Sequence, residues 1–234
     1  MAPFRPTPAL LRRRAALALA PTLALAPALL AAPALAQAPA ATPAPAAEPA
    51  PDPRMAERGI GKPEAPVRVI EFFSLTCSHC AAFHKEVFPR IKAELVATGQ
   101  ARMVWRDFPL DRLALAAAAV ARSLPAERYE GFIGALLANQ DRWAFTRGDP
   151  KEELGKMAAL AGMNRTTYDQ VFADEGLQRA IMEGRARAEQ EYQVQATPSF
   201  NFASLAKSPA IGHNQSGEMS FEVFARNVQE AAKA

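Results

Sequence analysis

Cysteine and histidine are scarce in this chain of 234 residues, which contains two cysteines and three histidines. Two cysteines, Cys77 and Cys80, cannot form a framework of several disulfides. Together with His84 they have a C-x2-C-x3-H spacing, but no second cysteine pair exists to complete a sulfur-rich zinc site. Any sulfur chemistry is therefore concentrated in one short segment, "TCSHC", at residues 76–80.

Acidic residues are missing from the first 36 positions, which carry four arginines. An apolar run from Ala15 to Ala32 follows these arginines, and the small residues Ala34 and Ala36 suit cleavage. We expect residues 1–36 to be a secretory signal peptide that exports the protein to the periplasm. The alternative is an uncleaved membrane anchor, because the apolar run is just long enough to span a bilayer. The arginines at 12–14 also leave a twin-arginine export route open.

A basic surplus is also lacking once this segment is set aside. The whole chain has 27 Lys and Arg residues against 24 Asp and Glu residues. Residues 37–234 keep 23 basic and 24 acidic residues, which is a net charge of −1. Because phosphate binding needs a concentrated basic surface, the composition argues against a nucleic-acid partner.

Bulky apolar residues are missing from residues 38–53, where six prolines and seven alanines occupy sixteen positions. Such a composition cannot form a core and favours extended, semi-rigid chain. We therefore interpret residues 37–54 as a linker and residues 55–234 as the folded domain.

Strand and helix patterns alternate at the start of this domain. The β-branched and aromatic run "VRVIEFF" at residues 67–73 predicts a buried strand. Apolar residues at helical spacing from Ser78 to the "TGQ" at 98–100 predict a helix, and residues 101–110 predict a second strand. Strand, helix and strand form a βαβ unit, in which the two strands should be parallel.

Helical patterns fill the next part of the chain, from about residue 112 to 191, with Asn164 as one helix N-cap. Residues 197–204 then predict a strand, residues 208–219 a short second strand with turns, and a final helix begins near Ser220. The pattern indicates a mixed sheet covered by helices and interrupted by an all-helical insertion.

The position of the cysteine pair favours redox chemistry over a structural disulfide or zinc. A bridge from Cys77 to Cys80 closes too short a loop to stabilise the fold much. Cys77, however, stands where a strand ends and a helix begins, so the helix N-terminus would stabilise its thiolate. If its pKa fell to about 4, the reduced form would gain about 4 kcal/mol at pH 7, equivalent to about 90 mV. His79, between the cysteines, could favour the thiolate further.

Three segments resemble the DsbA family of thiol-disulfide oxidoreductases. The segment "VIEFFSLTCSHC" at residues 69–80 is similar to that family's active-site segment, in which a strand leads into a C-x-H-C motif. "WRDFPLD" at residues 105–111 resembles its second strand, and "TPSF" at residues 197–200 resembles its cis-proline loop. The resemblance implies a thioredoxin fold with an inserted all-helical domain at about residues 112–191.

The resemblance also implies roles for particular residues. Cys77 would exchange disulfides with substrate and Cys80 would resolve the mixed disulfide, without a metal or organic cofactor. Pro198 would carry a cis peptide bond beside the cysteines, and Thr197 would present its backbone to an extended substrate strand. Glu71 would be a buried acid that relays the Cys80 proton, unless it points to solvent from an edge strand.

The working hypothesis is a monomeric periplasmic oxidase of reduced or unfolded exported proteins, reoxidised by a DsbB-like membrane partner. An isomerase or reductase of the same fold, and a non-catalytic binding module, are the alternatives. Ser78 stands where the best-known oxidants have proline, and Ala196 replaces a frequent glycine. These two departures leave the reduction potential open.

Overall fold

The structure is a computed structural model that describes residues 52–208 and 212–234. The expected signal peptide and nearly all of the expected linker lie outside the described residues, so both stay predictions. The described residues belong to one compact unit. None of the helices within these two ranges is long and apolar enough to cross a bilayer.

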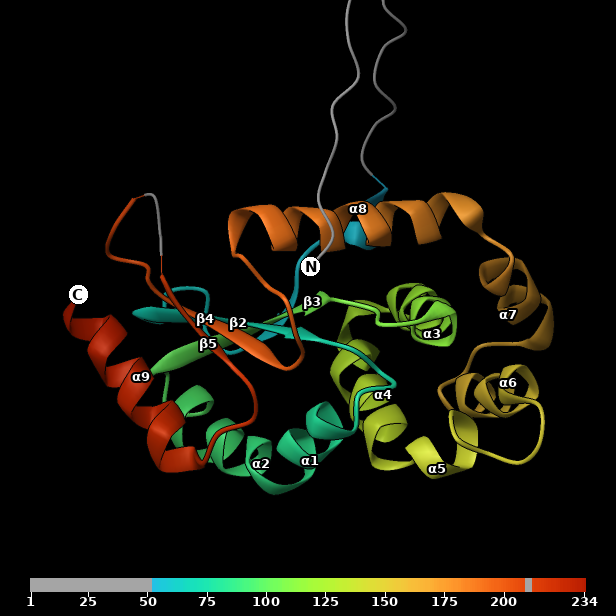
Figure 1. Cartoon of the computed structure of the whole chain (residues 1–234), viewed down its shortest axis with the longest axis horizontal. Helices are drawn as coiled ribbons and strands as arrows, with labels where there is room; N and C mark the ends of the chain where they lie inside the picture. Colours follow the sequence, from blue (N-terminus) through green and yellow to red (C-terminus); the bar gives the residue numbers. More distant parts are fainter. Residues whose placement is uncertain (1–51, 209–211) are drawn as a thin grey trace, which may run out of the picture. The chain divides into compact units, whose positions relative to one another are not determined.

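The sheet in the described part of the chain has five strands in the order β1-β3-β2-β4-β5 (Figure 1). Their bounds are Arg58–Ile60 (β1), Val67–Phe73 (β2), Ala101–Asp107 (β3), Ser199–Ser204 (β4) and His213–Ser216 (β5). The pair β2 and β3 is parallel, as predicted, and the other neighbours are antiparallel. The sequence pattern missed β1, because it is three residues long and Gly61, with a φ of 98°, ends it at once.

Alternation along β2 directs its side chains into two different apolar clusters. Val69 and Phe73 belong to a large cluster that also contains Cys80, whereas Ile70 and Phe72 belong to a smaller one. Glu71 lies between Val69 and Phe73 in this alternation and therefore points toward the large cluster. Its neighbours in register are Trp105 on β3 and Phe200 on β4, so the acid sits on a central strand.

One predicted helix after β2 is divided into three parts. These are α1 (Ser78–Glu86), α2 (Phe88–Ile91) and the π-turn η2 (Lys92–Val96). Pro89 is the physical reason for the break, because proline has no N–H to continue the ladder and fits only the first turn of a new helix. The last helix, α9 (Phe221–Lys233), is capped by Ser220 and lies on the same side of the sheet as α1 and α2 (Figure 1).

The predicted helical insertion lies between β3 and β4 and contains six helices. They are α3 (Arg112–Arg122), α4 (Ala126–Ala138), α5 (Gln140–Trp143), α6 (Pro150–Leu160), α7 (Arg165–Phe172) and α8 (Glu175–Glu191). Asn164 caps α7 by accepting a hydrogen bond from the Thr167 N–H, as expected. The insertion does not stand apart from the sheet, because Ala188 of α8 packs in the smaller cluster with Ile70 and Phe72.

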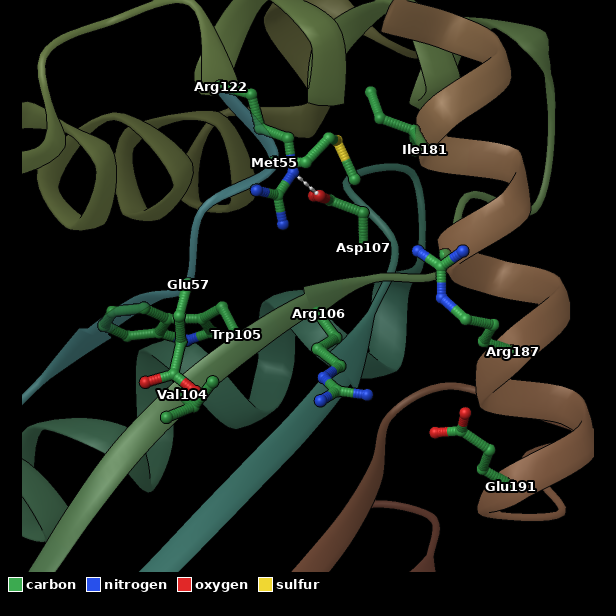
Figure 2. A pocket seen from close by; sticks show the side chains of 11 residues that line it. Met55, Glu57, Val104, Trp105, Arg106, Asp107, Arg122, Ile181, Arg187 and Glu191 are labelled. Atoms are coloured by element: carbon green, nitrogen blue, oxygen red, sulfur yellow. Dashed lines mark hydrogen bonds and ion pairs between the residues drawn. The ribbon is translucent and has the colours of Figure 1, made fainter. Parts of the chain in front are cut away.

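A buried ion pair joins the insertion to the sheet. Arg122 of α3 pairs with Asp107 at the end of β3, and both side chains are at most 5% exposed (Figure 2). Tyr129 of α4 donates a hydrogen bond to the other Asp107 oxygen at 3.2 Å. Arg122 also donates to the backbone oxygens of Arg54 and Ala56, at 3.1 and 3.2 Å. Because the ion pair also has hydrogen bonds to Tyr129 and to the backbone of Arg54 and Ala56, it fixes how α3, α4 and the first described residues pack against β3.

Candidate active site

Cys77 occupies the junction between β2 and α1, where the sequence places it. It is the N-cap of α1, with extended backbone angles, and its sulfur accepts a hydrogen bond from the Cys80 N–H at 3.4 Å. The side chain therefore lies against the unpaired N–H groups and the positive end of the helix. Cys77 is 7% exposed and Cys80 is fully buried. Both are free thiols in the structure.

The cis-proline loop lies directly beside Cys77, although 120 residues separate them in sequence. The Cys77 thiol donates to the Thr197 carbonyl oxygen at a sulfur–oxygen distance of 3.4 Å. The peptide bond between Thr197 and Pro198 is cis, which confirms the expected isomer. Thus the structure brings Cys77, Thr197 and Pro198 together beyond the end of β2 and the start of β4.

The surroundings of Cys77 lower the pKa of its thiol to about 5. The hydrogen bond from the Cys80 thiol is the largest cause, because it stabilises the thiolate. Burial opposes the shift, while Thr197 and the backbone N–H groups of Cys80 and His79 add to it. At pH 7 such a thiol is almost wholly ionised, and the thiolate is the form that attacks disulfides.

The surroundings of Cys80 act in the opposite direction. Burial is the largest cause that raises the pKa of the Cys80 thiol well above its ordinary value. The neighbouring Cys77 sulfur and the negative charge of Glu71 raise it further. Cys80 therefore stays protonated at neutral pH unless a nearby group takes its proton.

Glu71 is fully buried on β2, so the possibility that it points to solvent from an edge strand is excluded. Both of its carboxylate oxygens lie 3.0 Å from Nε2 of His84. Nε1 of Trp105 donates to Oε2 at 3.0 Å. The predicted relay of the Cys80 proton by Glu71 stays a prediction, but the acid does lie close enough to Cys80 to act on its charge.

His79 lies on the exposed side of α1, with a side chain that is 68% exposed. Its Nδ1 is 3.1 Å from Oε1 of Glu218, in the segment that precedes α9. The part of His79 that helps to lower the Cys77 pKa is its backbone N–H. Any effect of the imidazole on the thiolate therefore stays a prediction.

Sequence reasoning missed three residues near the cysteines. It considered His84 only as a zinc ligand and did not consider Trp105 or Gln140. The amide of Gln140, from α5, donates to the backbone oxygens of Leu75 and Cys77 at 2.8 and 3.0 Å. Helical spacing could have found His84, which follows Cys80 by four residues, but no local signal marks Gln140.

A groove runs beside α1 and next to the site. It has a volume of about 460 Å³. Its lining includes apolar and acidic side chains from α1, from the segment before α9 and from α9: Phe83, Glu86, Val87, Glu218, Met219, Phe221 and Glu222. Neither cysteine lines the groove, but one of its lining residues, Glu218, contacts His79 between them.

A second cavity, of about 260 Å³, lies between β3 and α8 and contains neither cysteine. Figure 2 shows its charged lining, with Arg106 on β3 and Arg187 and Glu191 on α8. The Asp107 and Arg122 pair closes one end. Among the described residues, no group of three or more His, Cys, Asp or Glu side chains is arranged to hold a metal ion.

The chain is similar in sequence to the thioredoxin family and to proteins named as protein-disulfide oxidoreductases. The thioredoxin family model matches residues 54–203. A Rickettsia typhi protein that carries the name "putative protein-disulfide oxidoreductase" is 28% identical over 142 residues, which cover 60% of this chain and 52% of that protein. The chain thus spans about half the length of the curated relatives it matches.

Solved structures agree on the fold. The crystal structure of alpha-DsbA1 from Wolbachia pipientis matches with a TM-score of 0.70 and 28% identity, over 76% of this chain and 92% of that one. Oxidised BdbD from Bacillus subtilis matches with a TM-score of 0.60 and 19% identity, over 76% and 94% of the two chains. The five-stranded mixed sheet with its helical insertion is therefore a thioredoxin-like fold, as predicted.

Proposed function

The chain belongs to the thioredoxin family, and from this premise we propose that it introduces disulfides into exported proteins through Cys77 and Cys80. The observation that carries the proposal is the contrast between the two thiols. Their surroundings lower the pKa of Cys77 to about 5 and raise that of Cys80. A protein with such a pair has one sulfur suited to exchange with a substrate and one suited to stay inside.

The reaction follows from this division. A substrate thiolate attacks the Cys77 sulfur of the oxidised protein, the bond between Cys77 and Cys80 breaks, and Cys80 leaves as a thiolate that takes up a proton. A second substrate thiolate then attacks the substrate sulfur of the mixed disulfide. Cys77 leaves as a stable thiolate, and the two electrons that the substrate thiols lose have passed to the protein, whose cysteine pair is now reduced.

The direction follows from the pKa of Cys77. A leaving thiol with a pKa of about 5 is ionised at pH 7, which stabilises the reduced protein by about 3 kcal/mol relative to an ordinary thiol. This energy corresponds to about 60 mV for a two-electron couple. The shift favours transfer of the disulfide to substrates, which is the behaviour of an oxidase.

The substrates we propose are reduced or unfolded exported chains. The Thr197 carbonyl beside Cys77 can accept a hydrogen bond from an extended strand. The adjoining groove offers apolar contacts from Met219 and Phe221, which suit an unfolded segment. We also propose that residues 1–36 direct the protein to the periplasm, where it acts as a monomer without a bound cofactor. A DsbB-like membrane protein would reoxidise it there.

Two measurements test this proposal. The reduction potential, determined against glutathione, should lie well above the value of about −270 mV that is typical of thioredoxin. A potential near that value would contradict the oxidase and favour a reductase. The Cys80→Ala variant, first converted at Cys77 to a mixed disulfide with nitrothiobenzoate, should release the nitrothiobenzoate thiolate on attack by a reduced, unfolded substrate and accumulate a mixed disulfide with it, whereas a non-catalytic binding module would accumulate none.

A further inference from the structure

A buried acid and imidazole pair lies beneath Cys80. Glu71 is fully buried and the His84 side chain is 6% exposed. Nε2 of His84 is 3.0 Å from each oxygen of Glu71. One imidazole nitrogen thus faces a whole carboxylate group, a geometry in which a proton can be held between the two side chains.

Trp105 fixes the orientation of the carboxylate. Its Nε1 lies 3.0 Å from Oε2 of Glu71, and an indole N–H can only donate. Oε2 therefore accepts from Trp105, and any proton that the pair holds lies on His84 or on Oε1. Glu71 and Trp105 are also directly opposite in the register of β2 and β3, so the backbone holds this contact in place.

Cys80 lies next to this pair. His84 follows Cys80 by four residues on α1, a spacing that puts both on one face of the helix. The charge of Glu71 acts on Cys80 strongly enough to raise the pKa of its thiol. Cys80, Glu71 and His84 therefore form one buried cluster of titratable side chains.

Aromatic rings close this cluster off from other charges. The His84 ring lies 4.9 Å from that of Phe88, 5.8 Å from that of Phe83 and 6.4 Å from that of Phe73. On the β3 side, Trp105 contacts the ring of Tyr129 at 6.2 Å, and beyond it lie Asp107 and Arg122. Among these buried groups, Glu71 is the carboxylate whose charge acts on the Cys80 thiol, and His84 is the imidazole that bonds Glu71.

We propose that His84 is a positioning residue that, together with Glu71, holds the proton exchanged with Cys80. The inference rests on the proposed disulfide exchange and assigns its buried proton step. When substrate attacks Cys77, the leaving Cys80 thiolate takes the proton from the pair. In the reverse step the Cys80 thiol returns the proton, and its thiolate attacks the Cys77 sulfur of a mixed disulfide and expels the bound thiol as a thiolate.

Rapid mixing of the reduced protein with the aromatic disulfide dithio-bis-nitrobenzoate tests this assignment. Cys77 attacks first and releases one coloured thiolate, and Cys80 then resolves the mixed disulfide and releases a second. For His84→Gln, which keeps an N–H donor but cannot carry the proton, we expect the second phase to slow about tenfold at pH 7. Its pH profile should also move to higher pH, while the first phase keeps its rate.

Two further variants separate a proton role from a packing role. Glu71→Gln should slow the second phase about a hundredfold. The double variant of Glu71 and His84 should be no slower than Glu71→Gln, because a pair that acts as a unit is not additive. His213→Gln changes an exposed histidine that bonds Asn227, and it should alter neither phase.

The outcomes distinguish this inference from the proposed function. A second phase of unchanged rate and unchanged pH profile in His84→Gln would overturn the role of His84. So would additive losses in the double variant. A first phase that is slow at pH 7 in the unsubstituted protein would instead contradict the proposed function, since it would mean that Cys77 is not a thiolate.

Discussion

Cys77 and Cys80 are three residues apart, yet the surface side of the site lowers the pKa of one thiol and the interior side raises that of the other. On the surface side, N–H groups at the start of α1 and the loop at Thr197 surround a sulfur that is 7% exposed. On the interior side, apolar rings and the charge of Glu71 surround a sulfur that is fully buried.

One helical turn is therefore enough to place two identical side chains in environments that suit different roles. The first cysteine meets the unpaired donors of a helix terminus, and the second meets the core that the same helix covers. The C-x-x-C spacing supplies part of each environment, since each cysteine is a cause of the other's pKa shift. Other parts come from elsewhere in the chain, namely Thr197 beside Cys77 and Glu71 of β2 near Cys80.

Substitution of either cysteine should have the largest effect on activity. Cys77→Ser should lower the turnover of a reduced test peptide by about a thousandfold or more, because no other thiol can accept the substrate. Cys80→Ser, first converted at Cys77 to a mixed disulfide with nitrothiobenzoate, should instead exchange it for a mixed disulfide with a peptide that carries a single thiol, and this product should persist because no Cys80 thiol is left to expel the peptide. Turnover together with gel analysis under non-reducing conditions measures both. Equal behaviour of the two variants would contradict the division of roles.

Between pH 7 and pH 4, the ionisation of Cys77 changes and that of Cys80 does not. The lowered pKa of Cys77 stabilises the folded, reduced protein fully above the ordinary thiol pKa, and this stabilisation is lost as the pH falls through about 5. Between pH 7 and pH 4 the reduced form should therefore lose about 3 kcal/mol of unfolding free energy relative to the oxidised form. Over this range Cys80 stays protonated, folded or unfolded, so it contributes nothing.

Denaturant unfolding of both redox forms at several pH values measures this loss. The oxidised form is the matched control, because it has no thiol to titrate. A difference between the two forms that does not change with pH would contradict the expected thiolate.

A substitution of Gln140 tests whether the helical insertion stabilises the junction between β2 and α1. Gln140→Ala leaves the carbonyl oxygens of Leu75 and Cys77 without this donor and should cost about 2 kcal/mol of stability. Asn139→Ala is the control, because the Asn139 amide, directly after α4, donates to the Ala135 carbonyl oxygen of that helix rather than to the active-site junction. It should cost less than about 1 kcal/mol. Equal losses would mean that the contact to the active-site junction has no special weight.

Of these substitutions, we expect the one at Thr197 to have the smallest effect, confined to the pKa of Cys77. Thr197 lowers the Cys77 pKa less than the Cys80 thiol does, but more than the backbone N–H groups of Cys80 and His79. Thr197→Val should therefore raise that pKa by less than about one unit and leave Cys80 unchanged. Titration of the thiolate absorbance measures the shift, and an unchanged titration curve would mean that the Thr197 side chain does not affect the Cys77 pKa.

Much of this site could be predicted from local sequence. The run "VRVIEFF" before "TCSHC" gave the strand-to-helix junction, because β-branched residues and helical spacing are local signals. Burial of Glu71 followed from its place in an apolar strand. The cis isomer at Pro198 was an implication of the resemblance, since most bonds before proline in folded proteins are trans.

Other contacts could not be predicted because they join distant segments. Gln140 reaches Cys77 across 63 residues, and Trp105 reaches Glu71 across 34. Gln140 belongs to no motif, the segment "WRDFPLD" does not indicate that Trp105 contacts Glu71, and only the packing of α5 and β3 brings the two residues to the site. Pro89 is a different case, because its effect on the helix after Cys80 is local and a stricter use of proline rules would have found the break.

The most direct test of the central claim is a titration of Cys77 by its thiolate absorbance in the reduced protein, with the oxidised protein as the blank. The account predicts a single transition with a pKa of about 5 and no ionisation of Cys80 up to pH 8. A transition near the ordinary thiol pKa of about 8.5 would contradict it, because the two cysteines would then have no physical basis for different roles.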